Sequence, residues 1–131
     1  MLRGLRIKNF RLLRDVDIEF EPDAPTVLIG PNSAGKSTIL EVLDFLSRCA
    51  NEGLQSAVAA HGGIGSIRTR TVTDPIEIEA RLGFKMNRSW DLTWSLRLQL
   101  GSGGGAAVSH ESLEDSSPLY SRFLVRTNEN G

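Results

Sequence analysis

The sequence predicts an α/β (α+β) fold, in which a mixed sheet surrounds one helix and an antiparallel β-subdomain follows. Three observations lead to this prediction. Apolar and polar residues alternate within residues 2–20, as they do in half-buried strands. A glycine-rich loop at residues 30–37 separates a short apolar run from a helical pattern. From residue 75 onward the alternation returns with a period of two, which is typical of antiparallel strands wetted on one face.

Three strands are expected before the loop. Residues 2–10 and 16–20 alternate regularly in polarity, and residues 11–15 connect them. Residues 26–29, Thr-Val-Leu-Ile, form a short apolar run with β-branched members. Such a run is typical of a buried strand, and this one is predicted to lead directly into the loop.

A helix is predicted after the loop, over residues 37–48. Its apolar side chains have spacings that largely suit one helical face, and they are Ile39, Leu40, Val42, Leu43 and Leu46. Residues 51–70 allow two interpretations, a second glycine-rich ligand loop or a flexible connection between two layers. The connection is favoured because no G-x-G-x-x-G pattern follows a strand there.

The C-terminal part is predicted to be an antiparallel β-subdomain. Its expected strands are residues 76–82, 92–100, 106–113 and 120–126, with turns at residues 86–91, 101–105 and 127–131. A turn follows the last strand with no further strand to pair with it, which indicates an incomplete domain. The predicted organisation is a first part at residues 1–70 and a truncated β-subdomain at residues 71–131.

Composition places the chain among globular proteins. Of 131 residues, 40% are hydrophobic and 24% are charged, and the net charge of −1 favours no particular partner. The single cysteine, Cys49, excludes an intrachain disulfide and suits a reducing compartment. The sequence contains neither an apolar run long enough to span a membrane nor a signal peptide, so a cytoplasmic location without membrane contact is expected.

Basic residues gather at the N-terminus. Five of them precede the first acidic residue, Asp15, and they are Arg3, Arg6, Lys8, Arg11 and Arg14. The cluster could face phosphates or nucleic acid. More often such charges are the solvated face of an edge strand, and that interpretation is favoured.

The loop at residues 30–37 fits G-x-x-x-x-G-K-[ST] at every fixed position, which is the Walker A phosphate loop. Lys36 can reach the β- and γ-phosphates of a nucleotide, and the hydroxyl of Ser37 can bind Mg²⁺. The backbone amides that would cradle the phosphates belong to Asn32, Ser33, Ala34, Gly35 and Lys36. The sequence therefore predicts a site for ATP and Mg²⁺.

Three segments carry a resemblance to a known family. They are residues 5–11 (Leu-Arg-Ile-Lys-Asn-Phe-Arg), residues 17–20 and residues 27–40. The first 70 residues resemble the N-terminal lobe of ABC-type ATPases of the SMC, RecF and OLD group. The most similar branch is that of the AAA-type ATPases found beside nucleases in bacterial repair and defence systems. Residues 71–131 resemble the β-subdomain of that branch by pattern alone.

The resemblance implies further residues and partners. Asn9 and Arg11 become candidate nucleotide contacts, although an exposed edge-strand arginine is an equal alternative for Arg11. Thr38 is placed at the α-phosphate. ATP bound between two heads would drive a head-to-head dimer, and DNA and a nuclease become possible partners.

Other catalytic motifs of that family are missing from the chain. We find no Walker B pattern and no signature motif, which in the family lie beyond the β-subdomain. Phosphoryl transfer needs such groups together, so the chain alone is expected to bind nucleotide poorly and to hydrolyse almost none. Two alternatives remain, the ATP-binding subunit of an ABC transporter and a non-hydrolysing regulatory or interaction module. A half-built sheet also predicts self-association.

Overall fold

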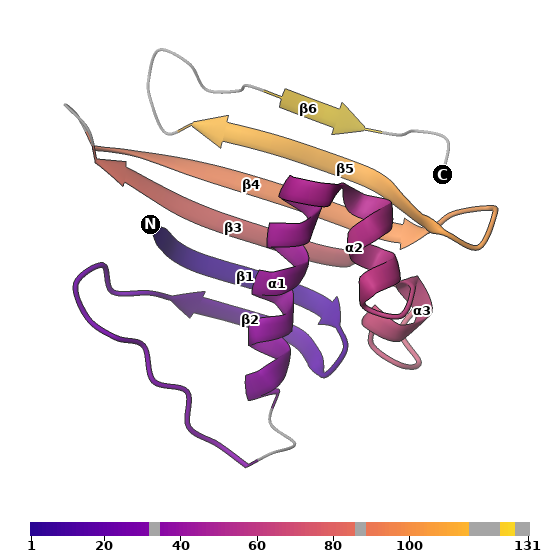
Figure 1. Ribbon diagram of the computed structural model, residues 1–131, viewed down its shortest axis with the longest axis horizontal. Helices are drawn as coiled ribbons and strands as arrows, with labels where there is room; N and C mark the ends of the chain where they lie inside the picture. The colour runs from indigo at the N-terminus through magenta and orange to yellow at the C-terminus, as the bar shows by residue number, and fades with distance from the viewer. Residues whose placement is uncertain (32–34, 86–88, 116–123, 128–131) are drawn as a thin grey trace.

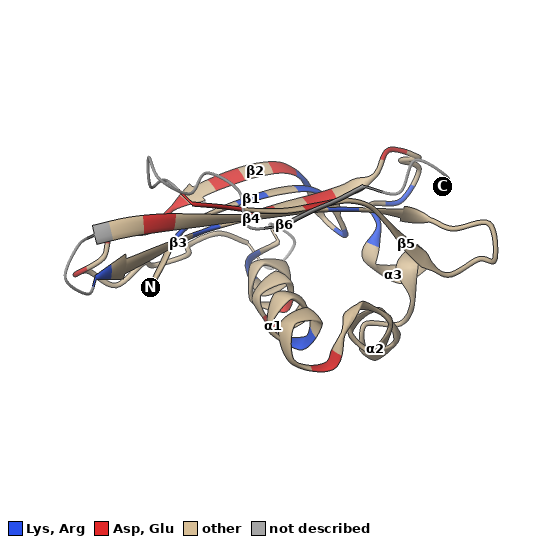
Figure 2. Ribbon diagram, turned by 90° about the horizontal axis from the view of Figure 1, so that it is seen from above, with Lys and Arg blue, Asp and Glu red and all other residues tan. Residues whose placement is uncertain are grey.

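The computed structural model describes residues 1–31, 35–85, 89–115 and 124–127. Within these ranges one sheet carries three helices on a single face (Figures 1 and 2). The elements are β1 (Leu2–Phe10), β2 (Leu13–Glu19), α1 (Lys36–Glu52), α2 (Leu54–Ala60), α3 (Ile64–Ile67), β3 (Ile76–Lys85), β4 (Ser89–Leu100), β5 (Ala106–Asp115) and β6 (Leu124–Thr127). The α+β class that the sequence predicts is therefore confirmed.

The strands follow the order β2-β1-β3-β4-β5-β6, and every pair of neighbours is antiparallel. The described strands thus contain no parallel pair, and the expected mixed sheet is corrected to an antiparallel one within this part of the chain. β1 lies between β2 and β3, so its basic side chains do not belong to an edge strand. β1 and β3 pair from Leu5↔Ala80 to Lys8↔Glu77, so the hydrogen-bonded sheet continues across the predicted boundary at residue 70.

The core lies between α1 and the centre of the sheet. Val42 and Phe45 of α1 are fully buried, and so are Leu5 and Ile7 of β1. The ring of Phe45 meets Phe10 edge-on with 5.8 Å between the ring centroids. Helix α1 is longer than predicted and ends at Glu52, where Gly53 takes a φ of 92°. Packing of this apolar stripe fixes the position of α1, and with it the position of the loop that precedes the helix.

Ion pairs cover the opposite face of the sheet. Arg81 of β3 contacts Asp17 at 2.8 Å and Glu79 at 3.2 Å, and it also pairs with Glu19. To reach β2, its guanidinium crosses β1 above Gly4, where an added Cβ would lie 2.3 Å from Arg81 Nη2. A larger residue at position 4 would therefore displace the guanidinium from this path.

The predicted strand at residues 26–29 is wrong. The segment is irregular, with Val27 72% exposed and Ile29 91% exposed. A strand in a buried sheet needs hydrogen-bond partners for its backbone as well as apolar side chains. Among the described residues, no strand pairs with this segment, and the neighbouring edge of the sheet is β2. Local propensity alone therefore did not produce a strand.

The predicted flexible connection at residues 51–70 is also wrong, because it contains α2 and α3. Both helices follow glycines with positive φ, Gly53 at 92° and Gly63 at 90°. Their buried residues are Ala57, Val58, Ile64 and Ile67. The helices are 7 and 4 residues long, too short for a periodic pattern to be apparent in the sequence.

The remaining strands agree with the prediction in type and differ in length. β4 begins at Ser89, which shortens the predicted turn at residues 86–91, and residues 86–88 lie outside the described residues. β5 continues two residues beyond its predicted end. The predicted last strand is described only at residues 124–127, where it pairs with β5. No described helix is long and apolar enough to cross a membrane.

Cys49 of α1 is half-buried, and burial together with the charge of Glu111 raises the pKa of its thiol to about 11. We expect Cys49 to react with iodoacetamide at pH 8 about 10-fold more slowly in the folded chain than in urea. The thiolate fraction falls about 100-fold, and the greater nucleophilicity of a more basic thiolate offsets about a factor of ten. Equal rates in the two states would contradict this environment. Mass spectrometry resolves the rate, because the chain has one cysteine.

Candidate phosphate-loop site

Helix α1 begins at the end of the phosphate loop, where Gly35 has a left-handed conformation with φ 89° and ψ 15° (Figure 1). A Cβ at this position would lie 2.9 Å from Cδ2 of Leu13, whose side chain is buried. The positive φ favours glycine here, and an added Cβ would also force the buried side chain of Leu13 to shift. The invariant glycine of the motif therefore has a physical explanation in this fold.

We expect Gly35→Ala to destabilise the chain by about 1–2 kcal/mol, because a left-handed non-glycine residue carries a cost of that size. Urea denaturation measures the change. The matched control is Gly65→Ala, since Gly65 lies in α3 with open space around its Cα and no positive φ. Equal stability of the two variants would show that Gly35 is not constrained.

The first turn of α1 suits an anion. No side chain caps the helix and its first turn carries no acidic residue, as far as the described residues show. The amides at a helix N-terminus have no partner within the helix, so they can donate to phosphate oxygens. The ammonium of Lys36 donates to the carbonyl oxygen of Gly30, at the start of the loop. These groups fit a polyphosphate, with the lysine already folded over the loop.

The structure brings together part of the predicted site. Lys36, Ser37 and Thr38 occupy the first turn of α1, where Ser37 is exposed and Thr38 is buried. The exposed hydroxyl of Ser37 fits the role of a Mg²⁺ ligand, because Mg²⁺ takes one or two protein oxygens and completes its shell with phosphate and water. Asn32, Ser33 and Ala34 lie outside the described residues.

Asn9 lies near the end of β1 and Arg11 lies in the β1–β2 turn, and both have a positive φ, 59° and 48°. The side-chain amide of Asn9 donates to the carbonyl oxygen of Pro75 at 2.9 Å. Arg11 donates through Nη1 to Glu41 at 2.7 Å and through Nη2 to the carbonyl oxygen of His61 at 3.1 Å. Both side chains thus hold protein partners, and they tie the turn to α1, α2 and the start of β3. The Nε of Arg11 is buried without a partner among the described residues.

Sequence reasoning missed the role of His61, which ends α2. Its side chain is 8% exposed, with Nε2 lying 3.3 Å from Asp44 of α1 and Nδ1 lying 2.9 Å from the carbonyl oxygen of Ala57. The imidazole also packs edge-on against Phe45, with the ring centroids 5.6 Å apart. Through these contacts His61 helps to fix the position of α1, the helix that follows the phosphate loop. The glycine-rich stretch around His61 has no hydrophobic periodicity, so the sequence did not indicate this role.

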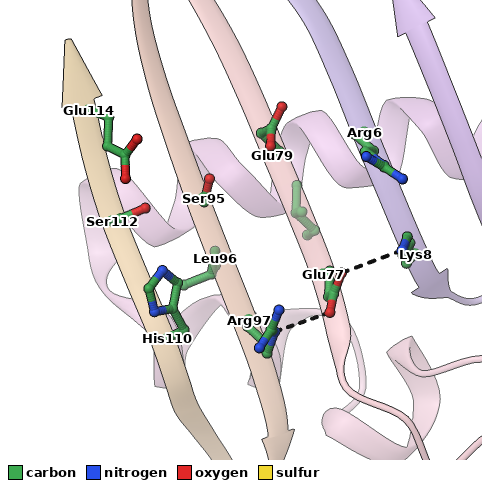
Figure 3. A pocket seen from close by; sticks show the side chains of 11 residues that line it. Arg6, Lys8, Glu77, Glu79, Ser95, Leu96, Arg97, His110, Ser112 and Glu114 are labelled. Carbon is green, nitrogen blue, oxygen red and sulfur yellow. Dashed lines mark ion pairs between the residues drawn. The ribbon is translucent and has the colours of Figure 1, made fainter. Parts of the chain in front are cut away.

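A hollow of about 300 Å³ lies on the opposite face of the sheet from the helices (Figure 3). Its lining carries both signs of charge, and Glu77 pairs there with Lys8 at 3.9 Å and with Arg97 at 3.1 Å. Such paired charges balance one another and leave little attraction for a charged ligand. Because the sheet separates this hollow from α1, it does not contribute to the phosphate-loop site.

Parts of the sequence are similar to known proteins. The sequence profile of the AAA ATPase domain family matches residues 1–89. The OLD nuclease of Thermus scotoductus is 48% identical over 46 residues, which are 35% of this chain and 8% of that protein. The replication and repair protein RecF of Roseiflexus castenholzii is 44% identical over 43 residues, 33% of this chain and 11% of RecF.

A transporter component is similar as well. The phosphate import ATP-binding protein PstB 1 of Streptococcus agalactiae is 27% identical over 97 residues, 68% of this chain and 38% of that protein. The chain thus spans less than half the length of these curated relatives. The profile covers more than half of the chain and includes the entire phosphate loop. The chain therefore belongs to the AAA ATPase domain family, within the ABC-type group of ATP-binding proteins that also contains OLD and RecF.

Proposed function

We propose that this chain is the ATP-binding, Walker A part of a DNA-associated ATPase similar to SMC, RecF and OLD proteins. One observation carries the proposal. The uncapped N-terminus of α1 presents Lys36 and Ser37 directly after a glycine that is held in the left-handed conformation. A helix end of this kind is a ready anion site, and the family adds that the anion is a nucleotide.

Each residue has a proposed role. Lys36 would leave the carbonyl of Gly30 to bind the β- and γ-phosphates, and the hydroxyl of Ser37 would bind Mg²⁺. Thr38 would contact the α-phosphate, and the amides of residues 32–36 would surround the chain of phosphates. Bound Mg²⁺ would neutralise charge on the phosphates. Two further groups are proposed to lie outside this chain, the Walker B glutamate that polarises the attacking water and the signature motif that a second subunit presents to the γ-phosphate.

Asn9 and Arg11 are retained as proposed nucleotide contacts because their turn lies against the loop. Leu12 lies in that turn and Leu13 directly after it, and a Cβ on Gly35 would lie 3.8 Å from Cβ of Leu12 and 2.9 Å from Cδ2 of Leu13. A nucleotide in the loop would therefore have the turn beside it.

A head-to-head dimer is proposed as the assembled state. Large apolar side chains are exposed near the loop, with Leu12 63%, Ile29 91% and Leu40 64% accessible. Exposed apolar surface of this kind is typical of contact sites. A second head, or further strands of the ATPase, would cover it. A nuclease partner is proposed by similarity to the OLD protein.

A second candidate is the ATP-binding subunit of a transporter, which the alignment with PstB 1 over 68% of this chain favours. The DNA-associated ATPase is preferred because the Asn-Phe-Arg opening before the loop resembles that group.

Calorimetric titration of Mg²⁺-ATP into the chain tests the proposal. Saturable heat that disappears when ATP is replaced by adenosine would show that the phosphates are recognised. A chain that is folded by circular dichroism and yet takes up no ATP would contradict the proposed function.

A further inference from the structure

A second hollow, of about 600 Å³, opens where the β1–β2 turn meets the segment after α3. Four arginines line it, and they are Arg11, Arg14, Arg68 and Arg70. The other lining residues are Leu12, Gly65, Ser66 and Thr69, so none of its walls is acidic. A hollow of this size falls within the range of ligand sites, and its lining favours an anion.

Three of these arginines have no acidic partner within the part of the chain that the structure describes. Arg11 is held by Glu41 at 2.7 Å, whereas no carboxylate of the described residues forms an ion pair with Arg14, Arg68 or Arg70. Arg14 and Arg70 are exposed, and Arg68 is half-buried. Cations gathered without acids repel one another, and an anionic ligand would relieve that repulsion.

The basic residues of the opposite face of the sheet are arranged differently. There Arg81 contacts three acidic side chains, and Glu77 bridges Lys8 and Arg97 (Figure 3). The chain as a whole has a net charge of −1, so acids are available in sufficient number. The positive charge of the hollow is therefore local, because the chain as a whole is not basic.

The backbone around the hollow is fixed by hydrogen bonds between its two walls. Thr69 donates through its amide to the carbonyl of Asn9 at 2.9 Å and through its hydroxyl to the carbonyl of Arg11 at 2.7 Å. Arg11 donates its own amide to the carbonyl of Ile67 at 2.7 Å. The backbone segments that carry Arg14 on one wall and Arg68 and Arg70 on the other are thus held together, so a ligand would need to order only the side chains.

We propose that Arg14, Arg68 and Arg70 bind the phosphodiester backbone of nucleic acid. The planar guanidinium group matches two oxygens of a phosphate at once, and an open hollow with several arginines suits consecutive phosphates of a strand. Because phosphate contacts carry no base information, binding is independent of sequence. The proposal rests on the proposed DNA association and assigns it to residues. Leu12 connects the hollow to the phosphate loop, since its Cβ lies 3.8 Å from the position of a Cβ on Gly35.

Fluorescence anisotropy of a short labelled DNA duplex, titrated with the full chain over a series of salt concentrations, tests this site. The test variant combines Arg14→Gln, Arg68→Gln and Arg70→Gln. Each lost phosphate contact lowers the slope of log affinity against log salt by about 0.9, so a fall of up to about 2.7 is expected. The matched control combines Arg6→Gln, Lys85→Gln and Arg97→Gln, which removes the same charge from other parts of the described sheet.

An unchanged slope in the test variant, or equal losses in test and control variants, would overturn the proposal. Loss of Mg²⁺-ATP binding with retained DNA binding would assign the arginines to the nucleotide instead and would also overturn it. If the wild-type chain binds ATP but no DNA at low salt, both the site and the DNA association fail while the phosphate-loop assignment stands. Arg14→Gln with Arg70→Gln, both at exposed positions, repeats the test if the triple variant unfolds.

Discussion

Lys36→Ala is expected to weaken binding of Mg²⁺-ATP by about 10- to 150-fold. A hydrogen bond to a charged group contributes about 1.5–3 kcal/mol, and Lys36 is the cation that the phosphate loop places at the β- and γ-phosphates. In the structure its ammonium group lies on the carbonyl of Gly30, so the side chain already points along the loop. Isothermal titration calorimetry of the two proteins side by side measures the effect.

The matched control is Lys85→Ala, because Lys85 is an exposed lysine at the end of β3. It should bind Mg²⁺-ATP as the wild type does. The helix should remain intact in Lys36→Ala, since alanine favours helix and Lys36 is only partly buried. Nucleotide binding that survives Lys36→Ala unchanged would show that the phosphates lie elsewhere on the protein.

Phe45→Ala is expected to destabilise the fold by about 3–5 kcal/mol, the usual cost of truncating a buried phenylalanine. Phe45 is fully buried at the middle of α1, where it contacts both Phe10 and His61. Small domains have a total stability of only about 5–15 kcal/mol, so a large part of it would be lost. Urea denaturation followed by far-ultraviolet circular dichroism gives the change in the free energy of unfolding.

Ser47→Ala serves as the control on the same helix, because Ser47 is exposed. Its free energy of unfolding should change by less than about 0.5 kcal/mol, as is usual for surface substitutions. If Phe45→Ala and Ser47→Ala had the same small effect, α1 would not be anchored to the sheet through this face. Its N-terminus would then have no fixed position relative to the β1–β2 turn.

Two features of the sequence sufficed to predict much of this molecule. The alternation in residues 2–10 gave β1 with its observed bounds, because a strand half-covered by a helix needs one apolar and one polar face. The pattern of the phosphate loop placed α1 correctly after Gly35, because glycine, lysine and serine have separate chemical tasks there. Such features depend on neighbours that are close in the sequence.

Long-range contacts decided the remainder. Residues 26–29 have the composition of a buried strand but no pairing partner among the described residues, and a strand exists only where another backbone accepts its hydrogen bonds. The pairing of β1 with β3 and the order of the strands also depend on segments more than 60 residues apart. A local sequence pattern does not indicate which strands will pair with each other in the sheet.

The sequence by itself determined the phosphate loop, the helix after it and most strands, since these follow from residue chemistry and short periodicities. Only the tertiary structure shows that Arg11 forms an ion pair with Glu41 and that His61 lies beside Asp44. It also brought Arg14 together with Arg68 and Arg70, which are more than 50 positions away in the sequence. The reason is physical, because ion pairs and anion sites depend on distances in space, and folding brings distant segments together through burial of the core they share.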